Sequence, residues 1–242
     1  MARQGAVARG RTNDPDGLRR RLVDAAYEAF ATHGYHATSM HDLKRATGST
    51  GGALAHHFPT KKELGLAVLQ DRVADAVEET WIRPVLSART AAEGIDMVFS
   101  RIADELERQQ SVSGCPLNNL ALELSRQDDD FRRLIDGVFG RWRAAIAEKI
   151  RADQSTGLLR DFDAEAFATF VVAAYSGAMA MAKASQSTDA LKVCAAQLTG
   201  AMQERAPSHS PASYPESHLI CGSKSGSIEG PDPKDEKETK TP

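Results

Sequence analysis

The chain has 242 residues, of which 41% are hydrophobic, and this is enough for two small domains or one large helical domain. Three cysteines without C-x-x-C spacing argue against a disulfide framework and a thiolate zinc site. The N-terminus has no apolar signal-peptide segment, and no apolar run approaches the length of a membrane span, so we expect a soluble cytoplasmic protein with no membrane contact.

The formal net charge of −3 conceals an asymmetry along the chain. Residues 1–62 hold 10 Lys and Arg against 5 Asp and Glu, whereas the remainder holds 20 against 28. A basic N-terminal part on an acidic body favours contact with a polyanion through that part alone. Residues 1–15 carry Arg3, Arg9 and Arg11 on a flexible basic arm, which either reaches DNA or is simply a disordered tail.

The first predicted helix starts near Leu18, where apolar residues recur every three or four positions up to Phe30, and it ends at Gly34. Two short helices joined by a tight turn follow. Ser39 and Asp42 form a capping-box pattern that starts one helix, and Gly48 can end it in the left-handed conformation. Thr50 can cap the next helix, which opens with two glycines and runs to Phe58. This is the helix-turn-helix plan.

The remainder of the chain is also predicted to be helical. A long helix begins at Leu64 and runs to about Trp81, where Pro84 breaks it, and another amphipathic helix covers residues 95–110. Pro116 suits the first turn of the helix that follows. Beyond it lie a long helix with an aromatic inner face over residues 131–150, closed by Gly157, and two last helices over residues 167–184 and 191–202. Residues 206–242 hold six of the ten prolines and are predicted to be a disordered tail.

The region from Leu18 to Leu66 contains a set of residues in a fixed order: Gly34-Tyr35, Ser39-Met40, Leu43, Gly48, Thr50, Leu54, His57-Phe58, Lys61 and Glu63-Leu64. On these residues the region resembles the DNA-binding domain of the tetracycline-repressor (TetR) family. Ala55, Gly51 and Lys44 depart from the usual pattern, which affects the detailed DNA contacts and not the domain. The segment Gly114-Cys115-Pro116-Leu117 resembles one found in a subgroup of these regulators.

The resemblance implies an all-α fold, with a three-helix helix-turn-helix domain over residues 16–63 and a larger ligand-binding and dimerisation domain over residues 64–205. It also implies a homodimer that represses transcription at a palindromic operator and is released by a small organic molecule. The effector, the operator and the choice between repression and activation stay open.

The helix-turn-helix motif predicts which residues contact DNA, and the apolar faces of the later helices predict which residues bind a ligand or form the dimer interface. We expect DNA contacts from the helix over residues 51–57, with His56 the best candidate for a base edge. The full DNA-binding set is Thr38, Ser39, Arg45, Thr50, Gly51, Gly52, Ala55, His56, His57 and Lys61. The predicted ligand-binding set is Phe99, Leu106, Cys115, Asn118, Leu122, Phe139, Trp142 and Phe170. The predicted dimer interface, with the chain's own core as the alternative, is Ala173, Gly177, Ala180, Ala184, Leu191, Ala195 and Leu198.

No catalytic constellation stands out in the sequence. It has no G-x-S-x-G elbow, P-loop, G-x-G-x-x-G or helical His-x-x-x-His pair, so we expect neither an enzyme, nor a cofactor, nor a metal site. Cys115 is either a reactive thiol or, more simply, a pocket or core residue. A helical-bundle enzyme and a protein-interaction module without DNA binding are the alternative functions.

Overall fold

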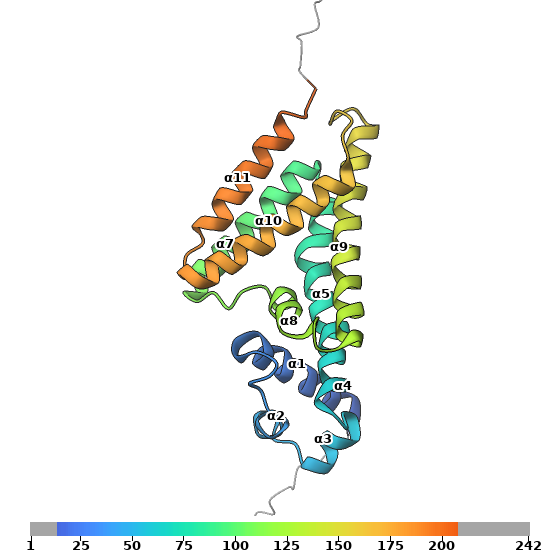
Figure 1. Cartoon of the computed structure of the whole chain (residues 1–242), viewed down its shortest axis with the longest axis vertical. Helices are drawn as coiled ribbons and strands as arrows, with labels where there is room; N and C mark the ends of the chain where they lie inside the picture. Colours follow the sequence, from blue (N-terminus) through green and yellow to red (C-terminus); the bar gives the residue numbers. More distant parts are fainter. Residues whose placement is uncertain (1–13, 208–242) are drawn as a thin grey trace, which may run out of the picture. The chain divides into compact units, whose positions relative to one another are not determined.

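The structure is a computed structural model that describes residues 14–207, and within this range every regular element is a helix (Figure 1). The all-α prediction is therefore confirmed. Arg3, Arg9, Arg11 and nearly all of the predicted tail lie outside the described residues. Residues 14–207 fall in one compact unit by their contacts, and one hydrophobic core runs from α1 to α11.

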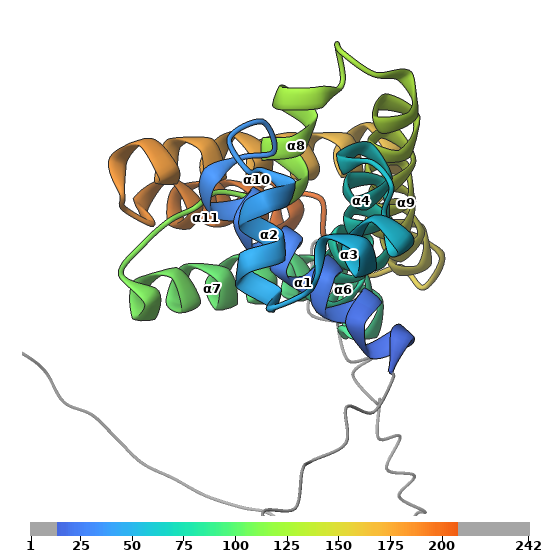
Figure 2. The same ribbon diagram turned by 90° about the horizontal axis from the view of Figure 1, so that it is seen from below.

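Four helices form the N-terminal part: α1 (Pro15–His33), α2 (Met40–Thr47), α3 (Gly51–His57) and α4 (Lys61–Val68). Asp14 caps α1, and α1 ends at Gly34, as predicted, where φ is +89°. α1 packs on both α2 and α4, with Leu22, Ala26 and Phe30 buried beneath them. Figure 2 views this part from its own end, where α2 and α3 lie in front.

A single continuous helix links this part to the rest of the chain. It consists of α4, the π-helical η1 (Leu69–Val73), α5 (Ala74–Val77), the π-helical η2 (Glu78–Ile82) and α6 (Arg83–Ser87). The prediction that Pro84 breaks this helix near Trp81 is wrong. A proline removes a hydrogen bond and clashes one turn back, but the wider π turns of η2 place Pro84 in the first turn of a new α segment, where both effects are small.

The π segments also explain an unusual burial pattern. Residues four apart in an α-helix are displaced by about 40° around the axis, so a strict four-residue period drifts off one face. The more open π turns reverse that drift. As a result every fourth residue stays buried along the whole helix: Leu69, Val73, Val77, Trp81 and Val85.

The C-terminal bundle packs around α9 (Asp129–Ser155). Its other helices are α7 (Ala91–Gln109), α8 (Pro116–Leu124), α10 (Ala164–Ser185) and α11 (Asp189–Gln203). α10 packs against α9 and α11, and α11 packs against α7. α8 is the short helix that contacts both α9 and α1, and α4 lies beside α9 in both ribbon views (Figures 1 and 2).

Helix α10 corrects one expectation from the sequence. Its 22 residues have a window with a mean hydropathy of 1.3, so by length and composition alone it is apolar enough to cross a membrane. Within the fold, 44% of that window is buried against neighbouring helices. Phe167, Val171 and Ala178 face the core, which accounts for part of this apolar character.

Asp153 fixes the start of α7 against α9. Its side chain is 2% exposed, and its Oδ2 accepts the Ala91 N–H at 2.6 Å. Its Oδ1 pairs with Lys149 Nζ at 3.0 Å, and Lys149 also donates to the Arg89 carbonyl. A carboxylate at a helix N-terminus is favoured by the unpaired N–H groups and the helix dipole.

We predict that Asp153→Ala lowers the free energy of unfolding by about 3 kcal/mol, because it leaves the buried Ala91 N–H without its acceptor and the largely buried Lys149 ammonium without its carboxylate. Urea denaturation followed by circular dichroism measures the change. Asp129→Ala is the control, since Asp129 pairs with Arg132 at the surface and exposed pairs contribute little. Equal losses in the two variants would contradict this role for Asp153.

Candidate DNA-binding surface and internal cavity

The helix-turn-helix is built by two side-chain caps and one glycine. Ser39 Oγ accepts the Asp42 N–H at 3.1 Å and starts α2, and Thr50 Oγ1 accepts the Ala53 N–H at 3.2 Å and starts α3. Gly48 ends α2 in the left-handed conformation, with φ of 62°. The residues predicted to start α2, to end α2 and to start α3 are thus confirmed in these roles.

Helix α3 presents an almost bare face. Leu54 is buried and anchors the helix to the domain, whereas Gly51, Gly52, Ala55 and His56 are exposed. A Cβ added at Gly51 or Gly52 would meet no atom within 4 Å. The fold of this chain therefore does not require glycine at either position, and a close approach of another molecule to the α3 backbone would explain both.

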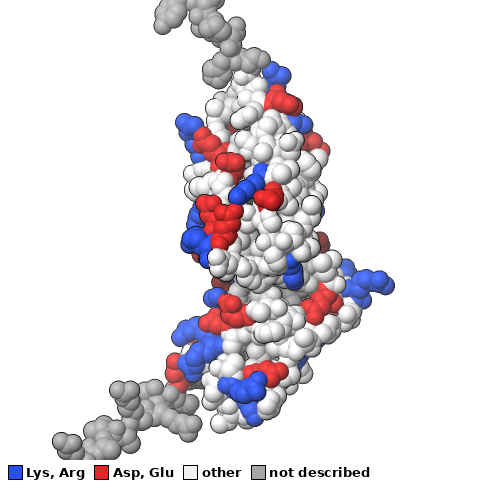
Figure 3. Space-filling model, turned by 90° about the vertical axis from the view of Figure 1, so that its left-hand side faces the viewer, with Lys and Arg blue, Asp and Glu red and all other residues white. Residues whose placement is uncertain are grey.

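The other predicted DNA contacts divide into exposed and internally used side chains. Arg45 is 75% exposed and makes only a loose pair with Asp42 at 3.3 Å. Thr38 is 5% exposed, and its hydroxyl donates to the Gly34 carbonyl at 2.9 Å. His57 is half-buried at the end of α3. In the view of Figure 3, Lys and Arg side chains lie at the lower end of the molecule among acidic ones.

Two lysines that follow α3 contact the protein itself. Lys61 Nζ lies 4.4 Å from the Tyr35 ring centroid and donates to the His36 carbonyl at 3.3 Å, and burial lowers the pKa of its ammonium. Lys62 Nζ pairs with Asp128 at 2.6 Å and Asp130 at 2.7 Å at the start of α9, and these hydrogen bonds raise its pKa. Lys62 therefore ties α4 to α9.

A carboxylate on α8 holds the turn between α1 and α2. Glu123 Oε2 accepts the Tyr35 N–H at 2.9 Å, and Glu123 Oε1 accepts the His36 N–H at 2.6 Å. At Gly34, where φ is +89°, a Cβ would come within 3.3 Å of Glu123 Oε2. Glycine at this position therefore permits both the left-handed turn and the close carboxylate. We call this pair of hydrogen bonds the Glu123 clamp.

Aromatic packing reinforces the clamp. Tyr35 lies edge-on to Phe131 of α9, with ring centroids 5.4 Å apart. Both rings press on Gly65 of α4, where a Cβ would come within 2.8 Å of each. The loop after α1, the start of α9 and α4 are thus locked together where the two halves of the chain meet.

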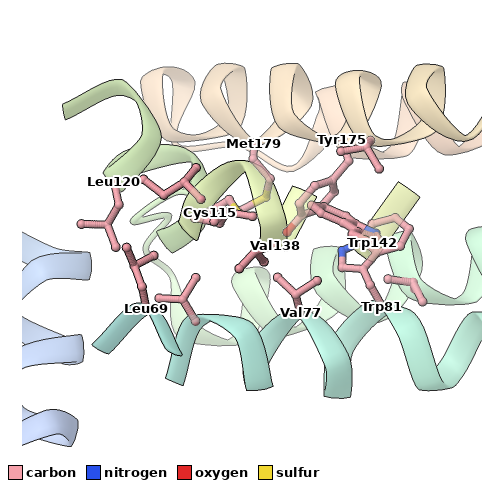
Figure 4. Close-up of a cluster of buried hydrophobic side chains, with 14 of the residues drawn as sticks. Leu69, Val77, Trp81, Cys115, Leu120, Val138, Trp142, Tyr175 and Met179 are labelled. Atoms are coloured by element: carbon pink, nitrogen blue, oxygen red, sulfur yellow. The ribbon is translucent and has the colours of Figure 1, made fainter. Parts of the chain in front are cut away.

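A cavity of about 120 Å³ lies beneath this junction. Its lining comes from α1, the long connecting helix, α8, α9 and α10, and includes Tyr27, Val77, Trp81, Cys115, Trp142 and Tyr175. Figure 4 shows Trp81, Trp142 and Tyr175 grouped together, with Cys115 and Val77 beside them. Tyr27 belongs to α1, so the DNA-binding half of the chain forms part of the cavity wall.

The cavity is aromatic and desolvated. Trp81 and Trp142 have ring centroids 5.0 Å apart, and Tyr175 lies 4.9 Å from Trp81 and 5.5 Å from Trp142. Burial raises the pKa of the Tyr175 phenol well above its ordinary value, and burial likewise raises the pKa of the Cys115 thiol. Both groups are therefore neutral at physiological pH. A thiol held protonated is a poor nucleophile, which favours the simpler interpretation of Cys115.

The structure brings only some of the predicted ligand residues together. Cys115 and Trp142 line the cavity; Phe99 and Phe139 pack behind it, on Trp81 and Trp142 respectively. Asn118 donates its Nδ2–H to the Ser176 carbonyl at 3.0 Å, and Leu106 lies elsewhere, along grooves at the far end of α7.

Two predicted ligand residues were placed on the wrong face. Leu122 is 84% exposed and Phe170 is 52% exposed, so neither points inward in the chain. On α8 the buried positions are Leu117, Leu120 and Leu124, and Leu122 falls between them on the opposite side. Helical spacing from Leu120 would have shown this.

Nine of the eleven residues that line the cavity are absent from the predicted ligand set, among them the aromatic residues Tyr27, Trp81 and Tyr175, and the clamp residue Glu123 is absent too. Trp81 and Tyr175 continue the apolar series through Val77 and Val171, and that spacing could have identified them. No apolar spacing of this kind identifies Tyr27, because its helix belongs to the predicted DNA-binding domain and not to the predicted ligand-binding domain. Spacing does not identify Glu123 either, since a carboxylate between two leucines is indistinguishable from a solvated one until the fold brings the Tyr35 turn to it.

The predicted dimer set also divides. Ala173, Gly177, Ala180 and Ala184 are exposed along one face of α10, and Met181 beside them is 63% exposed. By contrast, Leu191, Ala195 and Leu198 are at most 7% exposed and pack into the core of their own chain. For these three the intramolecular alternative holds, because α11 turns them toward α7 and α10.

Residues 14–207 contain no group of three His, Cys, Asp or Glu side chains placed to hold a metal ion.

Comparison with known proteins identifies both halves of the chain. Residues 22–68 match the family profile described as bacterial regulatory proteins, tetR family. Residues 91–197 match the profile described as transcriptional regulator LmrA/YxaF-like, C-terminal domain.

Individual relatives agree with these profiles. The chain is 28% identical over 181 residues to an uncharacterized HTH-type transcriptional regulator of Lactococcus lactis, covering 71% of this chain and 86% of the relative. It is 26% identical over 182 residues to the transcriptional repressor DhaR of a Mycobacterium species, covering 72% and 86%. A TetR-family regulator from Cytophaga hutchinsonii has the same fold, with a TM-score of 0.72, 21% identity and coverage of 81% and 98%.

We predict that Glu123→Gln speeds hydrogen exchange at the Tyr35 and His36 amides by roughly tenfold or more. Hydrogen bonds to a charged group contribute about 1.5–3 kcal/mol, and the substitution removes the charge and replaces one of the two acceptor oxygens with an NH2 donor. Exchange is followed residue by residue by NMR. Glu165→Gln, which alters an exposed pair with Arg151, is the control. Unchanged protection at both amides would mean that the clamp does not hold the turn.

Proposed function

We propose that this chain, which belongs to the TetR family of bacterial transcriptional regulators, acts in the cytoplasm as a homodimeric repressor that a small organic molecule releases from a palindromic operator. The observation that supports the proposal is the exposed face of α3, which carries almost no side chains, in a capped helix-turn-helix. The Glu123 clamp connects this helix-turn-helix to α8, and α8 borders the cavity.

The DNA-reading role belongs to α3. Its N-terminal turn exposes backbone N–H groups beside Gly51 and Gly52, and such a turn suits an anionic phosphate. His56 is exposed further along the same helix, and in the proposed complex it would contact a base edge in the major groove. Arg45 on α2 can exchange its loose partner for a phosphate oxygen.

The dimer role belongs to α10. Its exposed small residues form one continuous face. Phe170, just before this face, and Met181, beside it, add large exposed apolar side chains. Small residues let two helices approach closely, and an exposed apolar face of this kind favours burial against a second copy. A two-fold dimer would present two α3 helices to half-sites about 34–36 Å apart.

The switching role belongs to α8. Cys115 and Pro116 at its beginning line the cavity, and Glu123 near its end forms the clamp. A ligand that enlarges the cavity would displace α8 and therefore reorient the α1–α2 turn, changing the separation of the two α3 helices. Coupling of this kind is reciprocal, so operator DNA weakens ligand binding by the same factor, typically about 5–150-fold.

A mobility-shift assay with DNA from the upstream region of the gene tests the central claim. We expect a dimer to bind this fragment more tightly than a random duplex of equal length, with affinity falling steeply as salt rises, because basic residues release counterions from phosphates. Equal affinity for the two duplexes would argue against sequence reading. No binding even at low salt would favour a protein-interaction module instead.

We predict that Gly52→Ala leaves the free energy of unfolding unchanged or raises it by up to about 1 kcal/mol, because the added methyl meets no neighbour and alanine favours a helix. The same change should weaken operator binding by at least about tenfold, or 1.4 kcal/mol, if α3 approaches the DNA backbone closely. Gly140→Ala, also in open space but on α9, is the matched control and should leave DNA affinity unchanged. Full operator affinity in Gly52→Ala would remove the reason given for the bare face.

We predict that Ala180→Glu converts the dimer to a monomer, since it places two carboxylates against each other at the two-fold axis of an apolar interface. Light scattering coupled to size-exclusion chromatography measures the mass in solution. Gly140→Glu, which adds the same charge on α9, should remain dimeric. A dimeric Ala180→Glu would show that another surface of the chain makes the interface.

A further inference from the structure

Two of the side chains that line the cavity are tryptophans with buried indole N–H groups. Trp81 is 2% exposed and Trp142 is fully buried, and neither indole Nε1 has a hydrogen-bond partner within the part of the chain that the structure describes. Both side chains line the cavity, one from the connecting helix and one from α9. Buried donors are almost always satisfied, so two adjacent exceptions at one cavity call for a functional explanation.

The residues that line the cavity limit the kind of ligand that it can bind. The residues around the cavity include no Asp, Glu, Lys or Arg, and their only hydroxyl groups are those of Tyr27, Thr80 and Tyr175. Tyr175 is neutral and lies against both indoles. Its hydroxyl interacts with the Trp81 side chain, which lowers the pKa of the phenol against the larger effect of burial, but the contact falls short of hydrogen-bond geometry. The Tyr175 oxygen is therefore the acceptor with which a ligand would compete for the Trp81 N–H. The two indole side chains are therefore set among apolar and aromatic walls, and neighbouring side chains cover their nitrogens, so that a ligand has to displace these neighbours to reach the N–H groups.

Charge excludes two classes of ligand. A carboxylate would be buried without a counter-ion, which is very unfavourable in an apolar site. A cation would gain from the faces of the aromatic rings, but two indole N–H groups present their positive edges to the same space. A neutral molecule that carries a hydrogen-bond acceptor avoids both penalties.

Size gives a further limit. An apolar cavity of about 150 Å³ is known to hold benzene, so the 120 Å³ present here suits a single small ring. The mouth lies where Tyr27, Ala76, Thr80 and Pro116 are partly or fully exposed, between α1, the connecting helix and α8. A larger molecule would have to push α8 outward to enter.

We propose that the effector of this protein is a compact, neutral, largely apolar molecule whose carbonyl-type oxygen accepts hydrogen bonds from the indole N–H groups of Trp81 and Trp142. This rests on the proposed function, because it assigns a ligand class to the same cavity. One carbonyl oxygen has two lone pairs and can accept from both indoles, whose ring centroids are 5.0 Å apart. The ligand would then join the connecting helix to α9 while its ring contacts α8.

A matched pair of probes tests the acceptor. Cyclohexanone and methylenecyclohexane have nearly the same shape, but only the ketone can accept a hydrogen bond. The chain has two tryptophans, so ¹⁵N-labelled protein gives two indole N–H signals, and both report on the cavity. We expect the ketone to shift both signals downfield and to bind about tenfold more tightly than the alkene, as one or two added hydrogen bonds allow.

Substitutions distinguish the effect of the indole N–H groups from the effect of aromatic packing around the cavity. Trp81→Phe and Trp142→Phe each remove one N–H and keep an aromatic ring, and calorimetry should show the ketone preference reduced in both. Phe139→Leu is the control, because Phe139 stacks on Trp142 at 6.3 Å without lining the cavity. It should keep the preference. The wild-type indole signals need no variant and so remain informative if a substitution impairs folding.

Several results would overturn the proposal. Equal binding of ketone and alkene would mean that the indole donors are already satisfied within the protein, by the Tyr175 hydroxyl or by the faces of aromatic rings. Tighter binding of cyclohexylammonium or cyclohexanecarboxylate would assign the cavity to a charged ligand. Failure of all four probes to bind at millimolar concentration would show that the cavity admits no such ring.

The same experiment distinguishes this inference from the proposed function. If no probe binds but the protein still shifts operator DNA, the ligand class is wrong and the regulator remains. If the ketone binds through both indoles and operator affinity does not change, the ligand class stands and the cavity is not the switch.

Discussion

The rest of the structure depends on two hydrogen bonds, those from the Tyr35 and His36 N–H groups to the Glu123 carboxylate. They connect the helix-turn-helix to α8 through backbone atoms, so the position of the turn does not depend on a flexible side chain of the DNA-binding half. Bonds to an ionised acceptor are stronger than neutral ones, and a carboxylate that accepts two at once also fixes direction. Ser39, which starts α2, lies only three residues beyond this turn.

Helix α8 has nine residues and reaches from the clamp to the cavity, so a displacement at one end is carried to the other. Asn118 bonds the Ser176 carbonyl of α10 and limits the directions in which α8 can move. DNA and effector would therefore act on the same short helix from opposite ends. Allosteric coupling in the proposed function would therefore need a second position of α8, which both ligands would favour or disfavour.

Much of the fold could be predicted from the sequence, and the reason is local. Ser39, Gly48 and Thr50 act within a few residues of themselves, so their roles are visible without a tertiary structure. The errors concern long-range or orientation-dependent features. Leu191 and Ala173 are both apolar residues on the last two helices, and only packing decides that the first is internal and the second exposed. Glu123 lies 88 residues from Tyr35, a separation that no spacing rule covers.

The connecting helix shows how a local irregularity creates the cavity. With α-helical geometry throughout, Leu69, Val77 and Val85 would spiral away from one another around the axis, and Trp81 would turn from α9. The π turns of η1 and η2 keep the four-residue series on one face, at the cost of less regular backbone hydrogen bonding. That geometry brings the Trp81 ring against Trp142 of α9 and Tyr175 of α10, with centroid distances of 5.0 and 4.9 Å. Three helices far apart in the sequence thus contribute one aromatic wall, which is the wall that the proposed ligand would contact.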